Sequence, residues 1–213
     1  MDPYQSSERT EKICRLAPVI PVLVVQNPET ARPLAEALIS GGLPVLEITL
    51  RTESALQVIS EMAKVPGAVV GAGTITQSND IKNAINAGAS FAVSPGVTDT
   101  ILEESERHNL AIMPGAATPS EIMRLFEFGY SVQKFFPAEA NGGRAALKAI
   151  AGPLPNVKFC PTGGINRDNA EGYLELENSL CVGGSWVATQ KLIENKDWHT
   201  IHDLAKKASK LGS

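Results

Sequence analysis

The chain has 213 residues, of which 43% are hydrophobic and 20% are charged, a composition typical of one soluble globular domain. Its net charge of −4 and the lack of a dense Lys/Arg block argue against nucleic acid as the main partner. The longest apolar run, residues 16–25, is too short to span a membrane, and the start of the chain does not resemble a secretory signal, so we expect a cytoplasmic protein.

One unit, a short apolar run followed by a helical pattern, repeats along the chain. A helical pattern at residues 6–16 precedes the first run. The runs end near residues 25, 50, 74, 95, 114, 137, 162 and 184. The helical patterns between them occupy residues 28–42, 52–65, 78–89, 98–109, 118–129, 142–152 and 165–176, and a split final helix occupies residues 185–192 and 197–211.

This alternation predicts a parallel sheet, because each strand needs a helical crossover to reach the next strand in the same direction. Eight units in 213 residues favour a compact (β/α)₈ TIM barrel with an extra N-terminal helix over a doubly wound open sheet. We expect a single domain over residues 1–213, with the N-terminal helix at 1–17 and the barrel at 18–213.

The C-terminal ends of the strands form the active face of such a barrel, here called the mouth. In residues 45–51, VLEITLR, the aliphatic side chains share one parity, and Glu47, Thr49 and Arg51 share the other. With the aliphatic side chains under the helices, the polar set points into the barrel. An internal ion pair between Glu47 and Arg51 is one interpretation, and a catalytic carboxylate is the other.

Lys134 interrupts an apolar strand pattern within residues 131–143, SVQKFFPAEANGG. Its stem could pack while its ammonium reaches water. Alternatively, its apolar neighbours Val132, Phe135 and Phe136 remove hydration and favour the neutral amine that attacks a carbonyl to form a Schiff base. Only Lys134 among the lysines is expected to face the mouth. Together with Glu47, this favours the Schiff-base interpretation.

Glycine pairs follow the last two strands, in PTGGI (residues 161–165) and VGGS (residues 182–185). Backbone N–H groups of such turns attract phosphate, and these two loops are its usual place in a TIM barrel. The strand ends GAGT, SPG and MPG (residues 71–74, 94–96 and 113–115) are expected to shape the mouth through close backbone approach and rigid prolines.

Metal and disulfide chemistry are not indicated. The three histidines, at positions 108, 199 and 202, fall in helical patterns away from the mouth. Cys14, Cys160 and Cys181 are odd in number and lack CxxC spacing. Cys160 lies at a strand end, where it could act as a nucleophile, but we interpret all three as free, buried thiols.

Several long stretches carry a family resemblance: LEITLRTESAL, GAGT, SPG, KFFPAEANGG, FCPTGGI and CVGGSW. Over nearly its whole length the chain resembles the KHG/KDPG aldolases. The resemblance implies a class I aldolase without a cofactor or metal, a homotrimer of (β/α)₈ barrels. Such an enzyme cleaves 2-keto-3-deoxy-6-phosphogluconate (KDPG) to pyruvate and glyceraldehyde 3-phosphate in the Entner–Doudoroff pathway.

The same resemblance implies roles for individual residues. Lys134 forms the imine, Glu47 is the general acid and base, and Arg51 and Thr74 hold the pyruvate carboxylate. The remaining site residues follow by the same matching: Pro95, Phe136 and Thr162 line the pocket, and Gly163, Gly164, Gly184 and Ser185 meet the phosphate. After the fifth strand the family often reads PGIST, whereas this chain has Ala116 and Ala117 in MPGAATPSE.

Two other functions would use the same fold. A phosphosugar isomerase or epimerase would need a carboxylate base but would leave Lys134 without a covalent role. A non-catalytic phosphometabolite sensor would use the glycine pairs and tolerate loss of Lys134 and Glu47. 4-Hydroxy-2-oxoglutarate is a possible second substrate of the aldolase.

Overall fold

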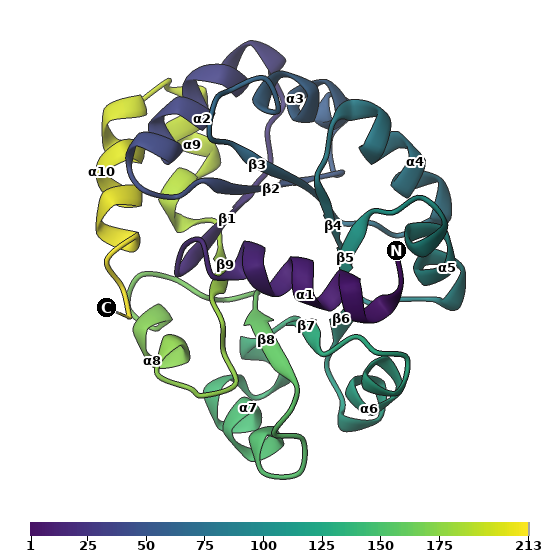
Figure 1. Ribbon diagram of the computed structural model, residues 1–213. Coiled ribbons are helices and arrows are strands. Elements are labelled where there is room, and N and C mark those ends of the chain that lie inside the picture. The colour runs from purple at the N-terminus through teal and green to yellow at the C-terminus, as the bar shows by residue number, and fades with distance from the viewer. Residues whose placement is uncertain (213) are drawn as a thin grey trace.

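The structure, a computed structural model, describes residues 1–212. Within that range short strands alternate with helices, and Figure 1 shows the strands gathered in the centre with helices α2 to α10 around them. The strands are β1 (Val19–Leu23), β2 (Val45–Thr49), β3 (Val69–Gly73), β4 (Phe91–Val93), β5 (Ala111–Met113), β6 (Gly115–Ala116), β7 (Val132–Phe135), β8 (Lys158–Pro161) and β9 (Val182–Gly184). The predicted alternation is confirmed.

The helices cover the outside of the strands. The α-helices are α1 (Pro3–Cys14), α2 (Ala31–Ser40), α3 (Ala55–Met62), α4 (Ser78–Ala87), α5 (Asp99–Arg107), α6 (Pro119–Glu127), α7 (Gly143–Ala151), α8 (Ala170–Leu174), α9 (Gln190–Glu194) and α10 (Trp198–Ala208). Short 3₁₀ helices are η1 (Pro28–Thr30), η2 (Glu139–Asn141) and η3 (Trp186–Ala188). Within residues 1–212 none of these helices has the length and apolar character to cross a membrane.

All strand pairs are parallel and fall in two sheets, in the orders β5-β4-β3-β2-β1-β9 and β6-β7-β8. The sequence predicts one strand where the structure has β5 and β6. Pro114 separates them because it has no N–H to donate to a ladder. Met113 pairs with β4, whereas Gly115 pairs with Lys134 of β7. The chain therefore changes sheet at this proline.

Side chains of alternate parity along the strands form two apolar layers. The outer layer includes Leu46 and Ile48 of β2 and packs under the helices. The inner layer is lined by strand residues of the other parity, such as Val45 and Val132. Each fully buried aliphatic side chain contributes roughly 1.5–3 kcal/mol to folding. The predicted parity of β2 is confirmed by these two layers.

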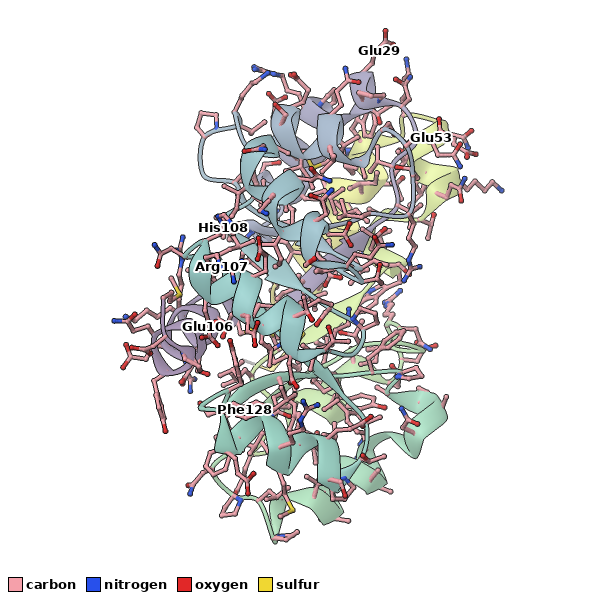
Figure 2. The ribbon with its side chains drawn as sticks, turned by 90° about the vertical axis from the view of Figure 1, so that its right-hand side faces the viewer. Glu29, Glu53, Glu106, Arg107, His108 and Phe128 are labelled. Atoms are coloured by element: carbon pink, nitrogen blue, oxygen red, sulfur yellow. The ribbon has the colours of Figure 1, made fainter. Side chains whose placement is uncertain are left out.

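Helix α1 closes the end of the strands opposite the mouth. Ile13 belongs to the inner layer, Ser6 Oγ accepts a hydrogen bond from the Ile112 N–H at 3.0 Å, and Ser7 Oγ accepts one from the Ser131 N–H at 3.0 Å. In Figure 2 α1 lies at the left, and Glu53, in the loop after β2, lies at the right. The helix begins at Pro3, before the helical pattern at residues 6–16 but within the expected segment 1–17, because Asp2 caps it.

The three cysteines, which are distant in the sequence, converge inside the strands. Cys14 of α1, Cys160 of β8 and Cys181 just before β9 are all free, buried and part of the inner layer. Cys14 and Cys160 beside it, together with burial, raise the pKa of the Cys181 thiol well above its ordinary value. This supports the interpretation of the thiols as core side chains.

Candidate active site

Lys134 and Glu47 meet at the centre of the site. Lys134 is the third residue of β7, Glu47 is the third residue of β2, and both point inward because of their parity. Lys134 Nζ donates a hydrogen bond to Glu47 Oε1 at 3.2 Å, and the side chains are 6% and 2% exposed. An ion pair this deeply buried requires each group to stay close to its partner.

The surroundings of the Lys134 amine are apolar. Its Nζ lies 5.2 Å from the centroid of the Phe136 ring, within the range of a cation–π contact. Phe136 follows β7 and precedes Pro137 through a cis peptide bond. The amine thus has one carboxylate and one aromatic face beside it. This arrangement can form an imine with a carbonyl compound and exchange protons with the carboxylate.

Glu47 occupies space that Gly73 leaves open on the neighbouring strand. A Cβ on Gly73 would lie 2.6 Å from Cγ of Glu47 and would overlap its carboxylate. Gly71, two residues earlier, is covered in the same way by the Phe91 ring. The predicted close approach at GAGT is therefore made by side chains from neighbouring strands.

Arg51 and Thr74 lie at the rim, after β2 and β3. Arg51 is exposed, and among residues 1–212 Glu47 forms its ion pair with Lys134 and not with Arg51. The alternative of an internal Glu47–Arg51 pair is wrong. Thr74 has φ of +62°, a left-handed conformation that is rare for a β-branched residue and costs energy.

Arg51 also lines a cavity of about 420 Å³ together with Gln26, from the loop after β1. The rim is thus built from the loops that follow β1, β2 and β3, and Gln26 joins it although no motif in the sequence indicated it.

Pro95 and Thr162 each lie against a glycine of another strand. A Cβ on Gly115 would overlap the carbonyl of Pro95, and a Cβ on Gly183 would overlap the Thr162 hydroxyl. Thr162 is buried, and its N–H donates to the Phe135 carbonyl at 3.0 Å. These contacts place the ends of β4 and β8 close to the neighbouring strands.

The predicted phosphate residues lie after β8 and β9. Gly163 and Gly164 have φ of +103° and +79°, in the left-handed region that favours glycine. Gly184 is buried against Trp186, whereas Ser185 is exposed and lines a cavity of about 210 Å³ with Val22, Val24, Ala188, Thr189 and Gln190. Val22 pairs in register with Glu47, so this cavity begins next to the ion pair.

Another cavity, of about 740 Å³, lies elsewhere, between α7 and α8. It is lined by Arg144, Lys148, Glu175 and neighbouring residues and contains neither Lys134 nor Glu47. We place the candidate site at the ion pair, because an amine and a carboxylate in contact can form covalent intermediates and exchange protons, and both point inward from their strands.

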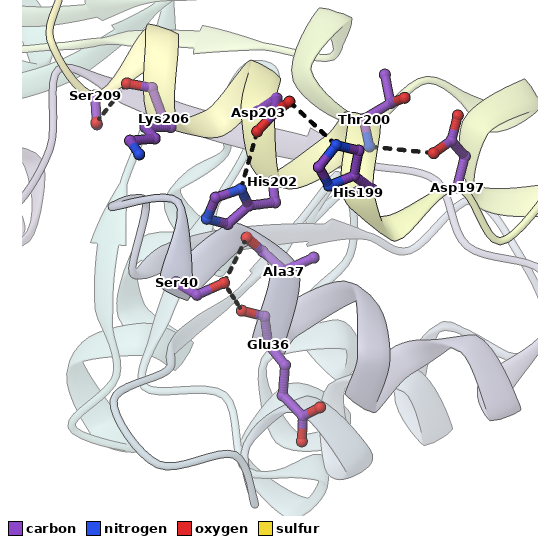
Figure 3. Close-up of polar contacts among 10 residues, drawn as sticks. All are labelled: Glu36, Ala37, Ser40, Asp197, His199, Thr200, His202, Asp203, Lys206 and Ser209. Carbon is purple, nitrogen blue, oxygen red and sulfur yellow. Dashed lines mark hydrogen bonds and ion pairs between the residues drawn. The ribbon is translucent and has the colours of Figure 1, made fainter.

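The histidines lie on outer helices, as expected. Figure 3 shows His199 and His202 of α10 bound to Asp203, with Nε2–Oδ2 and Nδ1–Oδ1 distances of 3.6 and 3.2 Å. His202 lowers the pKa of the Asp203 carboxyl below its ordinary value. Within residues 1–212 no group of three or more His, Cys, Asp or Glu side chains is arranged to hold a metal ion.

Two residues near the glycine turn of β8 were not singled out from the sequence. Glu139, in η2, lies against Gly164, and its carboxylate accepts a hydrogen bond from the buried hydroxyl of Tyr173 in α8. Glu139 falls inside KFFPAEANGG, one of the stretches that carry the family resemblance, so the sequence pointed to this region but not to Glu139 itself. No motif in the sequence indicated Tyr173, because only tertiary packing brings α8 next to η2.

Comparison with known proteins gives a consistent result. A family model described as KDPG and KHG aldolase matches residues 10–204. The chain is 51% identical over 192 residues to the 2-dehydro-3-deoxy-phosphogluconate aldolase of Pseudoalteromonas atlantica, covering 90% of this chain and 89% of that protein.

Solved structures agree. A KDPG aldolase from Legionella pneumophila, with pyruvate captured at low pH as a covalent carbinolamine intermediate, has a TM-score of 0.91 and 44% identity, over 94% of this chain and 98% of that one. The KDPG aldolase of Zymomonas mobilis with 3-phosphoglycerate has a TM-score of 0.91 and 45% identity, over 96% and 97%. The chain therefore belongs to the KDPG and KHG aldolase family of carbon–carbon lyases.

Proposed function

We propose that the protein is a class I aldolase that cleaves KDPG to pyruvate and glyceraldehyde 3-phosphate through a Schiff base on Lys134. The observation that carries the proposal is the buried contact between Lys134 and Glu47, at 3.2 Å. The covalent pyruvate carbinolamine of the Legionella pneumophila relative supports a nucleophilic amine. The isomerase and sensor alternatives are set aside, since family membership makes the chain a carbon–carbon lyase.

The reaction begins when Glu47 takes a proton from the Lys134 ammonium and the resulting neutral amine attacks the C2 ketone of KDPG. Loss of water from the carbinolamine gives a cationic imine, and Glu47 moves the protons directly or through a bound water. Glu47 then takes the proton of the C4 hydroxyl as the C3–C4 bond breaks. The electron pair of that bond moves into the imine, which becomes an enamine, and glyceraldehyde 3-phosphate leaves. Protonation at C3 and hydrolysis release pyruvate and free Lys134.

The remaining site residues bind the two ends of the substrate. Arg51 and Thr74 hold the pyruvyl carboxylate, and Pro95, Phe136 and Thr162 line the pocket. At the other end the phosphate meets a set of backbone and hydroxyl groups, namely Gly163, Gly164, Gly184 and Ser185. The 3-phosphoglycerate in the Zymomonas mobilis relative supports a site for a phosphorylated three-carbon compound.

Borohydride trapping tests the nucleophile. Reduction in the presence of pyruvate should add a pyruvyl group to the peptide that carries Lys134, and activity should survive EDTA because no metal takes part. Absence of the adduct, or its appearance on Lys158, would overturn the assignment.

The same chemistry extends to 4-hydroxy-2-oxoglutarate, which would give pyruvate and glyoxylate. This substrate keeps the pyruvyl end and lacks the phosphate. Ser185→Ala should therefore lower kcat/KM for KDPG by about tenfold, through loss of a charge-assisted hydrogen bond, and leave the other substrate nearly unchanged. Ser185 suits this test better than Gly184, where a side chain would displace Trp186. Equal losses on both substrates would remove the phosphate assignment.

The two sheets form one (β/α)₈ barrel in this proposal. On one side β5 and β6 are separated by Pro114 alone, so the two short strands serve as one barrel strand. On the other side two isolated bridges, Phe159 with Ser179 and Thr162 with Gly183, join β8 to the β9 segment. The bridges between β8 and the β9 segment are parallel, and β5 continues into β6 through Pro114. Closure of a parallel barrel requires such connections.

We also propose that the protein is a homotrimer and that it acts in the cytoplasm, in the Entner–Doudoroff pathway. Tyr4, at the start of α1, lies against Gly129 and so forms a small exposed apolar patch with the neighbouring Phe128; Tyr4 and Phe128 are exposed by 69% and 45%, and Met123 of α6 is exposed by 50%. Figure 2 shows Phe128 on the outer surface of the molecule. Such patches mark association surfaces. Light scattering should give about three times the chain mass of 22.6 kDa, and Met123→Glu should lower it; a monomeric wild type would exclude the trimer.

A further inference from the structure

In the glycine turn after β8, Gly163 lies against Pro137 and Gly164 lies against the side chain of Glu139. A Cβ on Gly164 would lie 2.6 Å from Cγ and 2.7 Å from Cβ of Glu139, so the Glu139 side chain already fills the space beside Gly164. Gly164 is exposed on its other side. Any movement of the turn toward η2 therefore requires movement of Glu139.

Backbone hydrogen bonds join the same two segments. The Ala138 N–H donates to the Thr162 carbonyl at 2.8 Å, and the Glu139 N–H donates to the Gly163 carbonyl at 3.1 Å. These two carbonyls accept hydrogen bonds from the N–H groups at the start of η2. The orientation of the peptide planes in the turn therefore depends on where η2 lies. That orientation decides where the N–H groups of the turn point.

The side chain of Glu139 is held in turn by Tyr173. The phenol of Tyr173 donates to Glu139 Oε1, and the Tyr173 side chain is fully buried in the outer apolar layer. Burial, and then the Glu139 carboxylate, raise the pKa of the Tyr173 phenol, so it remains a proton donor at physiological pH. The Glu139 carboxylate therefore has a fixed partner on α8.

The first turn of α7 packs beside this contact. A Cβ on Gly143 would lie 3.1 Å from the Tyr173 hydroxyl and 3.2 Å from Glu139 Oε1. The Arg144 guanidinium covers Gly172, the residue before Tyr173, and its charge acts on the phenol. The first turn of α7 thus encloses the hydrogen bond between η2 and α8.

A carboxylate beside a phosphate site repels the ligand by its charge, so recognition alone does not account for Glu139. We propose that Glu139 and Tyr173 are positioning residues, whose hydrogen bond holds the Gly163–Gly164 turn so that its N–H groups can receive the phosphate end of the substrate. This inference rests on the proposed function, because it assumes that the turn binds the phosphate.

The test uses binding and turnover together. Tyr173→Phe removes only the donor, Glu139→Ala removes the acceptor and the contact with Gly164, and Glu139→Gln keeps an acceptor oxygen. Tyr130→Phe is the matched control, because Tyr130 is also buried and donates to a glutamate, Glu106 at 3.1 Å, but lies before β7 at the opposite end of the strands. Glycerol 3-phosphate binding is read from the amide resonances of Gly163 and Gly164.

Tyr173→Phe and Glu139→Ala should each weaken glycerol 3-phosphate binding by about tenfold, the effect of one hydrogen bond to a charged group. Glu139→Gln should remain within about threefold of wild type and Tyr130→Phe should be unchanged. The KM for KDPG should rise in the first two variants, with kinetics on 4-hydroxy-2-oxoglutarate nearly unaffected. Thermal melts establish that each variant is folded.

The outcomes separate this inference from the function on which it rests. Equal effects of Tyr173→Phe and Tyr130→Phe, equal losses on both substrates, or no binding of glycerol 3-phosphate at the turn would overturn the positioning role. If wild type cleaves KDPG and Tyr173→Phe behaves like it, the positioning role is wrong and the function stands. If Tyr173→Phe weakens glycerol 3-phosphate binding but wild type cleaves neither keto acid, the proposed function is wrong and the positioning role stands.

Discussion

Two buried carboxylates in this molecule bind cations in different ways. Glu47 lies inside the strands, 2% exposed, and within the described residues 1–212 it accepts one side-chain hydrogen bond, from Lys134. Glu104 lies on α5, 8% exposed at its side chain, and contacts Lys82, Arg107 and His108 at 2.9, 2.8 and 3.0 Å. These three partners are all more exposed than the carboxylate itself.

Under the proposed function, Lys134 and Glu47 form a reactive pair and the Glu104 cluster a structural one. Both oxygens of Glu104 are occupied, so this carboxylate has little capacity left to exchange a proton with a ligand. Its cluster joins α5 to α4 through Lys82. Glu47 has one partner, and that partner is an amine suited to nucleophilic attack. Burial alone therefore does not distinguish the two carboxylates, whereas the number and kind of their partners do.

Replacing Lys134 by Met would have the largest effect. It removes the nucleophile, so turnover should fall by roughly 10⁴-fold or more. It also leaves Glu47 buried without its cation, which should lower the free energy of unfolding by about 3–5 kcal/mol. Urea denaturation and steady-state assays measure the two effects.

The double variant Lys134→Met/Glu47→Gln sharpens this result, because it removes both charges. Most of the stability should return while activity stays absent. If Lys134→Met cleaved KDPG at nearly the wild-type rate, the Lys134–Glu47 pair would have only a structural role, like the Glu104 cluster.

Glu47→Gln alone should have the next largest effect. It keeps the shape and an acceptor oxygen for Lys134 but cannot take a proton, so kcat should fall by about 10²-fold or more. Borohydride trapping with pyruvate should persist at a reduced rate. If Glu47→Gln had a normal kcat, the role of Glu47 would be limited to its contact with Lys134.

Gly73→Ala should have an intermediate effect that acts through Glu47. Its Cβ would overlap the Glu47 carboxylate, and displacement of a catalytic group by about 1 Å can cost about 10²-fold in turnover. Gly71→Ala is the control, since its Cβ meets the Phe91 ring instead. Equal kcat values for the two variants, both folded, would contradict the idea that Gly73 makes room for Glu47.

Glu104→Gln should have the smallest effect on activity, with kcat within about twofold of wild type, since Glu104 is outside the site. Its effect should be on stability and should depend on pH. The hydrogen bond from Lys82, followed by the charges of Lys82 and Arg107, lowers the pKa of the folded Glu104 carboxyl below 4.5.

A lowered folded pKa means stabilisation that is present above the ordinary pKa near 4.5 and lost as pH falls through the folded value. Thermal melts at pH 7 should therefore show a lower Tm for Glu104→Gln than for wild type. This difference should shrink as pH falls below about 4.5 and also shrink in high salt. A difference that stays constant down to pH 3 would exclude an ionic origin.

Much of the fold followed from local patterns. The alternation of apolar runs and helical patterns predicted the parallel strands and their order along the chain. The parity of β2 predicted which side chains point inward. Lys134 was found because a charge inside an apolar strand pattern is costly and therefore needs an explanation. Local patterns could not show that Pro114 divides one predicted strand between two sheets, because that depends on which neighbour each half pairs with.

The sequence by itself determined which residues are candidates for the chemistry and near which strands they lie, because parity and turn signals are properties of neighbouring residues. Only the tertiary structure decided which distant groups meet. Glu47 pairs with Lys134 and not with Arg51, Glu139 meets Tyr173, and three cysteines converge in the inner layer. These contacts join residues far apart in the sequence, and their geometry is set by strand register and helix packing, which no local pattern encodes.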